Sequence, residues 1–538
     1  MDTAPMDFET LRADLIGTDA VIRTPFGRRR VTYADYVASG RALRSVEERI
    51  GRLALPLYAN THTEDSATGA HSTHLSHQAA EYVKAQLGGD ASCKLVFCGS
   101  GSTAAVRRIQ DILGLTVPHA HRETVLAALP ERDRPVVFVG PYEHHSNEVS
   151  WRETIAEVVE VPLCPRGNLD LDALVQLLKA PAYAGRPKIG SFSAASNVTG
   201  LLTDTRSVAR VLHAHGAFAF FDFAASGPYV QIDMKPGKPD GYDAVFLSPH
   251  KFVGGPGTPG LLCFQAHLYQ LAVPSVPGGG TVRYVSRTDH SYVDDIEARE
   301  DAGTPAILGK LRTALAFHVK EALGVARLTA REHELFARAL ARLQPNPRVH
   351  LLGNPDAPRL AFLSFLIRAG EEGTYLHPRL VVRLLNDLFG IQARGGCACA
   401  GPYGHALLNI DDARSARYQQ CILGDLDGLK PGWTRLNLAP WATDEEVDFL
   451  LSAIEFVAAF GERFLPLYTL DWRSGAWTHP QDQAPPDLFG SHFPEREAGP
   501  IPYAAYLAEA QDLAASLPAG EGRALPENVP PDLVFFAY

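Results

Sequence analysis

Two apolar stretches decide the fold: Ala217-Phe218-Ala219-Phe220-Phe221-Asp222-Phe223 and Ala244-Val245-Phe246-Leu247-Ser248-Pro249-His250-Lys251. Each is a short apolar run with a charged side chain at or near its end. Other runs of this kind recur along the chain, at residues 94–98, 135–140, 158–162 and 189–192. Between the runs lie segments with apolar residues three and four apart, such as 77–87 and 205–215. Strands that alternate with helices predict an α/β fold with a mostly parallel sheet covered by helices.

The second half of the chain changes character twice. From about residue 311 to 343 the pattern is helical without strand signals, which indicates the passage into a smaller α+β domain. After Pro466, Pro and Gly recur without a period. We therefore expect an N-terminal segment that joins the small domain, a large domain, the small domain and a loop-rich extension, at residues 1–59, 60–325, 326–466 and 467–538.

Composition narrows the class of protein. The net charge of −11 argues against a nucleic-acid partner, because phosphate backbones require a basic surface. Seven scattered cysteines are typical of a reduced compartment rather than of a disulfide framework. The sequence has no long apolar run for a membrane helix and no basic-then-apolar leader at its start. We expect a cytoplasmic protein without membrane contact.

Asp222 and Lys251 indicate a cofactor. A carboxylate at the end of a buried strand requires a cationic partner. A protonated pyridine nitrogen is such a partner, and a lysine at the end of the next strand can form a Schiff base with the same molecule. This pair is consistent with pyridoxal 5′-phosphate (PLP). The alternative is that Asp222 caps a helix and Lys251 is solvated.

A turn that suits a phosphate follows one of the early predicted strands. The sequence Cys98-Gly99-Ser100-Gly101-Ser102-Thr103 lies between an apolar run and a helical segment. A Gly/Ser/Thr turn that opens a helix presents free N–H groups and the positive end of the helix dipole, which suit a phosphate. By itself the turn could also be an ordinary helix cap.

The motifs together resemble the class V aminotransferase family of fold-type-I PLP enzymes, most closely its cysteine desulfurase/selenocysteine lyase branch. The resemblance runs from about residue 30 to 465. Glu143-His144-His145-Ser146-Asn147 looks like the family's Glu-His-His-x-Asn, and Ser196-Asn197-Val198-Thr199-Gly200 looks like its Ser-Asn-x-x-Gly. The resemblance implies that His144 stacks on the PLP ring, that Asn197 contacts the cofactor or the substrate carboxylate, and that Asp222 binds the pyridine nitrogen.

The resemblance also covers the lysine motif and a dimer loop. Ser248, His250 and Lys251 match Ser-x-His-Lys, in which the lysine forms the Schiff base and the other two hold the phosphate. Gly278-Gly279-Gly280-Thr281 resembles a loop that reaches into the neighbouring subunit's phosphate site, which implies a homodimer with shared active sites. The implied cofactor-binding residues are Ser102, Thr103, His144, Asn197, Asp222, Ser248, His250, Lys251 and Thr281.

The smaller domain carries a substrate signature. Arg394-Gly395-Gly396-Cys397-Ala398-Cys399-Ala400-Gly401-Pro402 looks like the family's Arg-x-Gly-x-x-Cys-Ala-x-Pro. By that likeness Arg394 pairs with the substrate carboxylate, a role that suits a fork-shaped guanidinium, and Cys399 is the mobile nucleophile. Cys397 is an additional thiol, and Arg435 matches a second family arginine near the substrate. The alternative is an inert Gly-rich loop. We expect no metal, because no ligand cluster accompanies the two cysteines.

Two positions depart from the family pattern. Ala225 replaces a Gln that many members have, and Thr63, in Asn60-Thr61-His62-Thr63, stands where Arg is common. Both departures bear on the reaction more than on PLP binding. His71, His74 and His77 recur every three residues, and we interpret them as structural or active-site polar residues rather than as metal ligands.

These observations lead to one main hypothesis and two alternatives. The main hypothesis is PLP-dependent C–S or C–Se cleavage of a small amino acid, with cysteine as the leading substrate and a sulfur-acceptor protein as a partner. Lys251, Asp222, His144 and Cys399 are its catalytic residues. The first alternative is another class V reaction, such as transamination or β-elimination. The second is a PLP-binding scaffold whose extension docks a partner.

Overall fold

The computed structural model describes residues 4–370, 373–484, 487–491, 493–518 and 523–538. The chain divides into two compact units. Unit 1 consists of the described residues up to Asp7, Ala38–Ser196 and Leu201–Thr329. Unit 2 consists of the described residues of Phe8–Val37, Asn197–Gly200 and Ala330–Tyr538. Residues 38–59 belong to unit 1, and residues 8–37 belong to unit 2.

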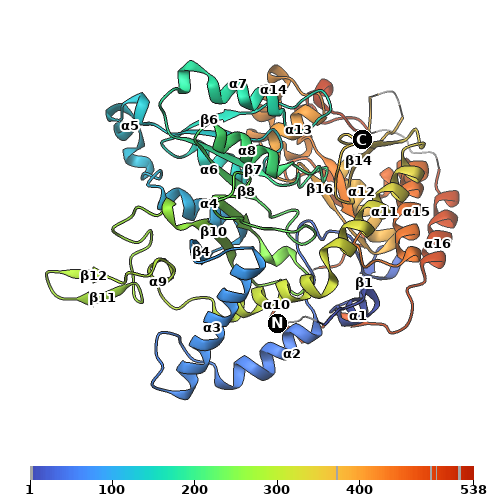
Figure 1. Cartoon of the computed structure of the whole chain (residues 1–538). Coiled ribbons are helices and arrows are strands. Elements are labelled where there is room, and N and C mark those ends of the chain that lie inside the picture. The colour runs from blue at the N-terminus through green and yellow to red at the C-terminus, as the bar shows by residue number, and fades with distance from the viewer. Residues whose placement is uncertain (1–3, 371–372, 485–486, 492, 519–522) are drawn as a thin grey trace. The chain divides into compact units, whose positions relative to one another are not determined.

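Unit 1 is built on a seven-stranded sheet with the strand order β4-β10-β9-β8-β7-β5-β6 (Figure 1). Its strands are β4 (Cys93–Cys98), β5 (Val136–Val139), β6 (Glu157–Glu160), β7 (Lys188–Ser193), β8 (Ala217–Asp222), β9 (Ala244–Leu247) and β10 (Gly260–Gln265). Strands β9, β8, β7, β5 and β6 pair in parallel, and β10 is antiparallel to both of its neighbours. The sheet is mostly parallel, which confirms the predicted fold class.

Helices cover both faces of this sheet. One face packs on α3 (Ala67–Gln86), α7 (Leu171–Lys179), α8 (Thr205–Ala214) and α10 (Ile307–Leu323). The other face packs on α4 (Gly101–Ile112) and α6 (Val149–Arg152). Along β8, Phe221 joins the first core and Phe220 the second, as the two-residue period of a strand requires. Burial on both faces explains why the strands are continuous apolar runs.

The remaining elements of unit 1 lie at its edges. They are α2 (Arg44–Arg49), which continues as a π-helical turn (Ile50–Ala54), α5 (His119–Ala128), α9 (Ile296–Arg299) and the hairpin β11 (Val282–Val285) with β12 (His290–Tyr292). The short 3-10 turns are Leu55–Leu57, Glu131–Asp133, His145–Asn147, Pro181–Tyr183, Pro249–Lys251 and Ala266–Leu268. Two of these turns, at His145–Asn147 and Pro249–Lys251, carry predicted site residues or lie next to them.

Unit 2 contains a four-stranded antiparallel sheet with the order β13-β14-β17-β16. Its strands are β13 (Val349–Leu351), β14 (Phe362–Ile367), β16 (Arg394–Gly396) and β17 (Trp433–Asn437). The helices of unit 2 are α1 (Phe8–Asp14), α12 (Pro378–Phe389), α13 (Gly401–Leu407), α14 (Asp412–Leu423), α15 (Asp444–Phe460), α16 (Tyr503–Ser516) and the larger part of α11 (Val325–Leu343). Thr443 caps helix α15 by accepting a hydrogen bond from the Glu446 N–H.

Smaller strands attach the two ends of the chain to unit 2. They are β1 (Ala20–Thr24), β2 (Gly27–Arg30), β3 (Thr32–Tyr33), β15 (Ile391–Gln392), β18 (Thr469–Asp471), β19 (Ala476–Thr478) and β20 (Glu495–Arg496). Strand β1 pairs with both β2 and β20, and β3 pairs in parallel with β15. The short 3-10 turns are Asp427–Leu429, Gly461–Leu467 and Pro531–Leu533. None of the helices in the described part of the chain is both long and apolar enough to cross a membrane.

The segment after Pro466 is more regular than the sequence suggested. It contains the 14-residue helix α16, whose buried residues Tyr506, Ala510 and Ala514 are four apart and join the core of unit 2. Phe536, near the C-terminus, forms a parallel β-bridge with Tyr375 and is also buried in that core. The helical period was hard to detect because two of the three inward residues are alanines.

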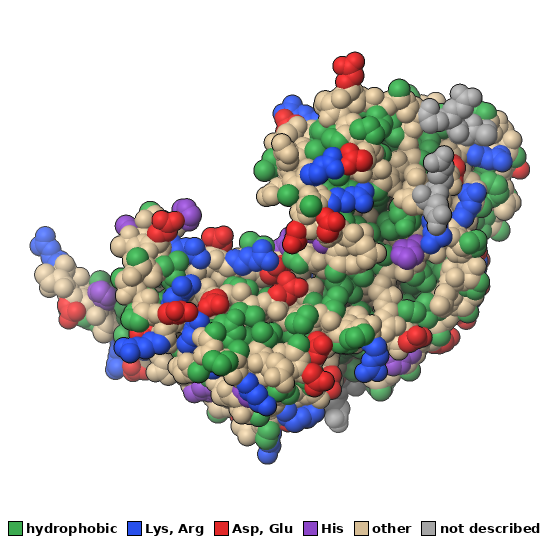
Figure 2. All heavy atoms as spheres, turned by 90° about the horizontal axis from the view of Figure 1, so that it is seen from above, with side chains coloured by type: hydrophobic (Ala, Val, Ile, Leu, Met, Phe, Trp, Pro, Cys, Tyr) green, Lys and Arg blue, Asp and Glu red, His purple; other side chains and the backbone are tan. Residues whose placement is uncertain are grey.

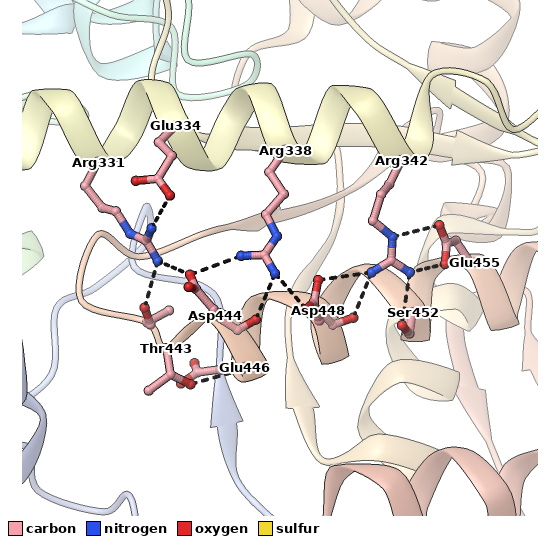
Figure 3. A network of polar contacts seen from close by, with 11 residues as sticks. Arg331, Glu334, Arg338, Arg342, Thr443, Asp444, Glu446, Asp448, Ser452 and Glu455 are labelled. Carbon is pink, nitrogen blue, oxygen red and sulfur yellow. Dashed lines mark hydrogen bonds and ion pairs between the residues drawn. The ribbon is translucent and has the colours of Figure 1, made fainter.

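An ion-pair network joins α11 to α15 within unit 2 (Figure 3). Arg331 and Arg338 both bind Asp444, at 2.7 and 3.0 Å, and Arg338 also binds Asp448 at 2.6 Å. One turn further along α11, Arg342 binds Asp448, the Ser452 hydroxyl and Glu455. The partners advance together along both helices, so the helices run in the same direction. Hydrogen bonds from Arg331 lower the pKa of Asp444, which keeps this carboxylate ionised until the pH falls below its ordinary range.

We predict that Arg342→Ala destabilises the chain by about 0.5–1 kcal/mol, because it removes two carboxylate contacts from a partly exposed network. The loss should shrink as ionic strength rises. Thermal unfolding at low and high salt measures both effects. Arg132→Ala is the control, since that side chain is 83% exposed and lies 3.9 Å from its acidic neighbour. A salt-independent loss would contradict the electrostatic account.

Candidate active site

Asp222 and Lys251 follow neighbouring parallel strands of unit 1. Asp222 is the last residue of β8, where it is in register with Phe246 of β9, and Lys251 ends the 3-10 turn that follows β9. Parallel neighbours end at the same edge of a sheet, which is where ligands of α/β proteins bind. The structure therefore places the two predicted cofactor residues at one edge.

The Asp222 carboxylate is buried, with 3% of its surface exposed. It accepts hydrogen bonds from the Ala224 N–H at 2.9 Å and from the Ser102 hydroxyl at 3.3 Å. Desolvation raises its pKa, and the Ala224 N–H and the positive charge of Lys251 oppose that shift. A buried carboxylate is stabilised in its ionised form by a ligand that brings a cationic N–H group.

Helix α4 begins beside these residues. The Ser102 N–H, in its first turn, donates to the Ser248 hydroxyl at 2.8 Å. Gly101 has φ +57°, and a Cβ at that position would lie 2.8 Å from Ser248 Oγ and 3.0 Å from His250 Cε1. Thr103 hydrogen-bonds the Ser146 hydroxyl at 2.6 Å. The turn is thus a close-packed cup at the positive end of a 12-residue helix, an arrangement that fits a phosphate group.

His250 is uncharged in this setting. Burial, with the charge of Lys251 next to it, lowers the pKa of the imidazole to about 4. The residue is therefore neutral at physiological pH. Attraction of a phosphate here depends on the helix end and on Lys251 rather than on an imidazolium.

Glu143, next to His144 in the chain, lies at the centre of a buried hydrogen-bond network that the sequence interpretation did not assign. Glu143, at 3% exposure, accepts from the Ser193 N–H and hydroxyl at 2.8 and 2.6 Å and from Asn147 at 2.7 Å. Burial raises the pKa of Glu143 to about 7, although these hydrogen bonds favour the ionised carboxylate and lower the pKa. Next to it, His144 Nδ1 accepts the Ser146 N–H at 3.1 Å, so a neutral ring carries its proton on Nε2.

Thr281 lies at the base of the β11–β12 hairpin. It is fully buried, and its hydroxyl donates to the Gly278 carbonyl at 2.7 Å. Within one chain this hydroxyl therefore braces its own loop. Its predicted role at a neighbouring subunit's phosphate stays a prediction.

The predicted substrate residues lie in unit 2. Arg394 on β16 is directly opposite Arg435 on β17 in the strand register. Asp35, which the sequence interpretation missed, lies between them: Oδ2 is 3.2 Å from Arg394 Nε, and Oδ1 is 3.1 Å from Arg435 Nη2. Like charges opposite each other on neighbouring strands repel, and the carboxylate of Asp35 offsets that repulsion.

Arg435 and Asn197 continue this cluster toward the cysteine loop. Arg435, at 3% exposure, donates through Nη1 to the Asn197 carbonyl at 2.7 Å. The Asn197 side-chain amide donates to the Ala398 carbonyl at 2.7 Å, and its Oδ1 has no hydrogen-bond partner in the described part of the chain. Asn197 thus holds the cysteine loop, and its remaining amide atom is an acceptor.

The cysteine loop has an unusual backbone. Ala398 and Cys399 both have positive φ, at +50° and +56°. Residues other than glycine adopt this left-handed conformation at a cost of about 1–2 kcal/mol each. Cys399 is exposed, whereas Cys397 is only partly so. Backbone strain of this kind concentrates at functional sites.

The remaining sequence-predicted features lie in unit 1. Ala225 is buried, and no side chain there replaces the family's Gln. On α3, His71 binds the Leu53 carbonyl at 2.8 Å, while His74 and His77 are exposed. Across the described ranges, no three His, Cys, Asp or Glu side chains are grouped so that they could hold a metal ion.

Comparison with known families gives the class of the chain. A family model described as Aminotransferase class-V matches residues 32–450. The chain therefore belongs to the class V aminotransferase family, as the sequence resemblance indicated, and it is an enzyme of that family.

Several curated relatives of the chain are named as cysteine desulfurases. A probable cysteine desulfurase from Halalkalibacterium halodurans is 26% identical over 406 residues, which are 75% of this chain and 92% of the relative. A probable cysteine desulfurase from Halobacterium salinarum is 26% identical over 433 residues, 80% and 96% of the two chains. A cysteine desulfurase from Klebsiella pneumoniae is 28% identical over 326 residues, 59% and 70% of the two chains.

Solved structures share the fold. The apo cysteine desulfurase from Thermococcus onnurineus superposes with a TM-score of 0.67 and 22% identity, covering 85% of this chain and 99% of that one. The S-sulfonic acid form of a cysteine desulfurase from Escherichia coli gives a TM-score of 0.62 and 22% identity, with 84% and 98% covered. At these identities the likeness concerns the fold.

The packed cup at Gly101 generates a prediction. Gly101→Ala should weaken PLP binding roughly tenfold or more, because the new methyl group meets Ser248 and His250 in addition to the strain of a positive φ. Titration of the protein with PLP, followed by the visible absorption of bound cofactor, measures this loss.

Gly114→Ala is the matched control. This glycine lies just beyond α4 with φ +67°, and nothing lies within 4 Å of the added Cβ. It should lose some stability but keep its PLP affinity. An equal loss of affinity in both variants would contradict the role of the close packing at Gly101.

Proposed function

We propose that this enzyme uses PLP to cleave the C–S or C–Se bond of a small amino acid, with cysteine as the leading substrate, and releases alanine through a persulfide on Cys399. One observation carries the proposal. The same chain places Lys251 beside a buried Asp222 at the edge of one sheet, and an exposed cysteine in a strained turn after Arg394 on another. The names of the curated relatives support the choice of substrate.

The residues of unit 1 fit PLP. Asp222 would bind the pyridine N–H, and the cup of Ser102, Thr103, Ser248 and His250 would hold the phosphate. His144 would stack on the ring, with its orientation fixed by Ser146 and by the network around Glu143. When bound, PLP supplies a carbonyl that reacts with amines and an electron sink for bond cleavage next to the amino group.

Lys251 would hold the cofactor and then move protons. Once an amino acid has replaced it, its free amine can take a proton from the substrate α-carbon and return it elsewhere. His250 would remain neutral at the same time, since its pKa lies near 4. Proton transfer would therefore rest on Lys251 rather than on the imidazole beside it.

Arg394 and Cys399 would act on the substrate itself. Arg394, whose side chain is 52% exposed, would bind the α-carboxylate, with Asn197 and Arg435 behind it. Cys399 Sγ would attack the substrate sulfur, so that the C–S bond breaks and an S–S bond forms. The β-carbon takes up a proton, alanine leaves, and the sulfur stays on Cys399 as a persulfide, ready for a sulfur-acceptor protein.

A second candidate reaction is transamination or a β-elimination that uses no thiol. Ala225 and Thr63 favour it, because both replace polar side chains that family members commonly have. Formation of a keto acid from an amino donor, without sulfide, would support it over desulfuration.

We also propose a homodimer in the cytoplasm, with a large domain that ends near residue 325 of the sequence, a small domain that follows it, and an extension after residue 466. The β11–β12 hairpin supports the dimer, because it projects from unit 1 at the left of Figures 1 and 2. It exposes Tyr284 and Val285 at 62% and 61%, and exposed apolar side chains of this size are typical of interfaces. The seven free cysteines support a reducing compartment.

Cys399→Ala should abolish persulfide formation and lower alanine release from L-cysteine by roughly two orders of magnitude or more, because the sulfur loses its acceptor. The visible absorption of bound PLP should not change. Alanine and sulfide assays measure the effect. Cys421→Ala is the control, since this partly exposed thiol lies outside the motif. Full alanine release from Cys399→Ala would refute the persulfide step, and loss only in Cys397→Ala would move the role to that residue.

Replacing Tyr284 by Ser together with Val285 by Asp should convert the dimer to monomers, because the interface would lose two apolar side chains and gain a charge. Light scattering coupled to size exclusion measures the mass. Val149→Ser, at a residue 44% exposed elsewhere in unit 1, should leave the mass unchanged. A dimer that survives the double variant would exclude the hairpin as its main contact.

A further inference from the structure

A cavity of about 200 Å³ lies in unit 2, between α11, β13 and the loop that leads into β14. Five apolar side chains form most of its wall: Phe336, Leu340, Val349, Leu351 and Leu363. Two residues of an α-helix span about 200°, so the face of α11 with Phe336 and Leu340 is opposite the one on which Arg338 and Arg342 bind α15 (Figure 3). An apolar cavity of about 150 Å³ accepts benzene. This cavity therefore has room for a ring with a small substituent.

Arg359 is the charged side chain among the described residues that line this cavity. It is 5% exposed, and its guanidinium lies over the ring of Phe336, with Cζ 4.4 Å from the ring centroid. Its terminal nitrogens donate to the Phe362 carbonyl at 3.0 Å and to the Asn354 carbonyl at 3.4 Å. Its Nε has no hydrogen-bond partner in the part of the chain that the structure describes. A guanidinium has five N–H groups, so these two bonds leave part of its capacity unused.

The charge of Arg359 is not balanced by the groups that bind it. They are two carbonyls and an aromatic ring, none of which carries a negative charge, whereas buried charges in proteins are normally paired. Burial lowers the pKa of the guanidinium to about 10, so it is still charged at neutral pH. Burial and the charge of Arg368 lower the pKa of His350, which also lines the cavity, so this imidazole is neutral and adds no second charge. The cavity thus combines one positive charge with an apolar wall.

We propose that this cavity is a binding site for a small organic carboxylate with an apolar body, whose carboxylate pairs with Arg359 and whose hydrocarbon part packs on the apolar wall. A planar guanidinium suits a carboxylate in shape and charge. The wall disfavours inorganic anions, because their surface is entirely polar. The site goes beyond the proposed function, since none of its residues belongs to the PLP motifs or to the substrate signature, and it does not depend on which reaction the enzyme catalyses.

The loop and strand that border the cavity are bonded to residues 197–200 of the same unit. The Leu360 N–H donates to the Gly200 carbonyl at 2.9 Å, and the Ser364 hydroxyl donates to the Val198 carbonyl at 2.6 Å. A ligand that fixes the loop should therefore also slow the local opening of residues 197–200, which hydrogen exchange of the backbone amides detects.

Calorimetric titration of the PLP-loaded enzyme with benzoate tests the proposal. Benzoate should bind saturably, one molecule per chain, and benzamide, which has the same shape without the charge, should bind at least about tenfold more weakly. Inorganic phosphate should also bind more weakly than benzoate, because it lacks the apolar body. Arg359→Met keeps an apolar side chain and removes the charge, so it should weaken benzoate binding at least about tenfold and leave benzamide binding unchanged. Equal binding of benzoate and benzamide to the wild type would overturn the site.

A second pair of variants avoids changes in the core. Gln344 lines the cavity and is exposed, so charged residues can replace it without disturbing the fold. Gln344→Glu should weaken benzoate binding and Gln344→Lys should strengthen it, each by about two- to threefold, because a nearby charge repels or attracts the anion. Gln420, exposed on α14, is the matched control, and the same two substitutions there should have no effect. Equal shifts at both positions would indicate a general effect of net charge and would contradict a local site.

Arg394→Ala separates the cavity from the candidate active site, and it should leave the affinity for benzoate unchanged. Saturating benzoate should slow amide exchange in peptides that cover residues 349–363 and 197–200 of the wild type, but not in Arg359→Met. If affinity falls in Arg394→Ala and not in Arg359→Met, or if exchange slows only elsewhere, benzoate binds at another place and the proposal is wrong. None of these measurements requires turnover, so failure of the proposed reaction would leave this site standing.

Discussion

The buried carboxylate of Asp222, at the end of strand β8, is the constraint on which the candidate active site of unit 1 depends. Desolvation raises the pKa of Asp222, and the Ala224 N–H and the positive charge of Lys251 oppose that shift. The sheet makes this possible because β8 and β9 end at the same edge. Helix α4 then begins at that edge and directs an N–H of its first turn onto Ser248. A ligand with a cationic ring nitrogen and a phosphate complements all three features.

Unit 2 contains the opposite case, a buried cation, Arg435, whose charge is neutralised by a side chain of the same unit. Arg435 is as buried as Asp222, but its charge is offset by Asp35 and its hydrogen bonds go to Asp35 and a carbonyl. Of the two opposed arginines, Arg394 is the exposed one, with 52% of its side chain accessible, and it can attract an anion. The contrast explains the division of labour between the units. Under the proposed function, unit 1 would leave a charge for the cofactor to balance, and unit 2 would leave one for a substrate that binds and is released.

The sequence allowed the regular parts of this arrangement to be predicted, because each depends on neighbours in the chain. Buried strands such as β8 are apolar runs, and α15 is preceded by its own cap at Thr443. The missed parts depend on distant partners. Asp35 meets residues 359 and 400 positions further along, and no local pattern marks such a pair. Glu143 stood within a recognised motif, but its network forms only when β5 and β7 lie side by side.

The strained turn at Ala398 and Cys399 is connected to the arginine pair by a series of hydrogen bonds. Two successive residues with positive φ would relax in an isolated loop, since each costs about 1–2 kcal/mol. Here the Ala398 carbonyl is held by Asn197, whose own carbonyl is held by Arg435, and the Ala400 N–H closes the turn on the Cys397 carbonyl at 3.1 Å. The backbone next to Cys399 is therefore linked through Asn197 to Arg435. A change at the arginine pair must then alter the cysteine loop as well, even when neither cysteine is touched.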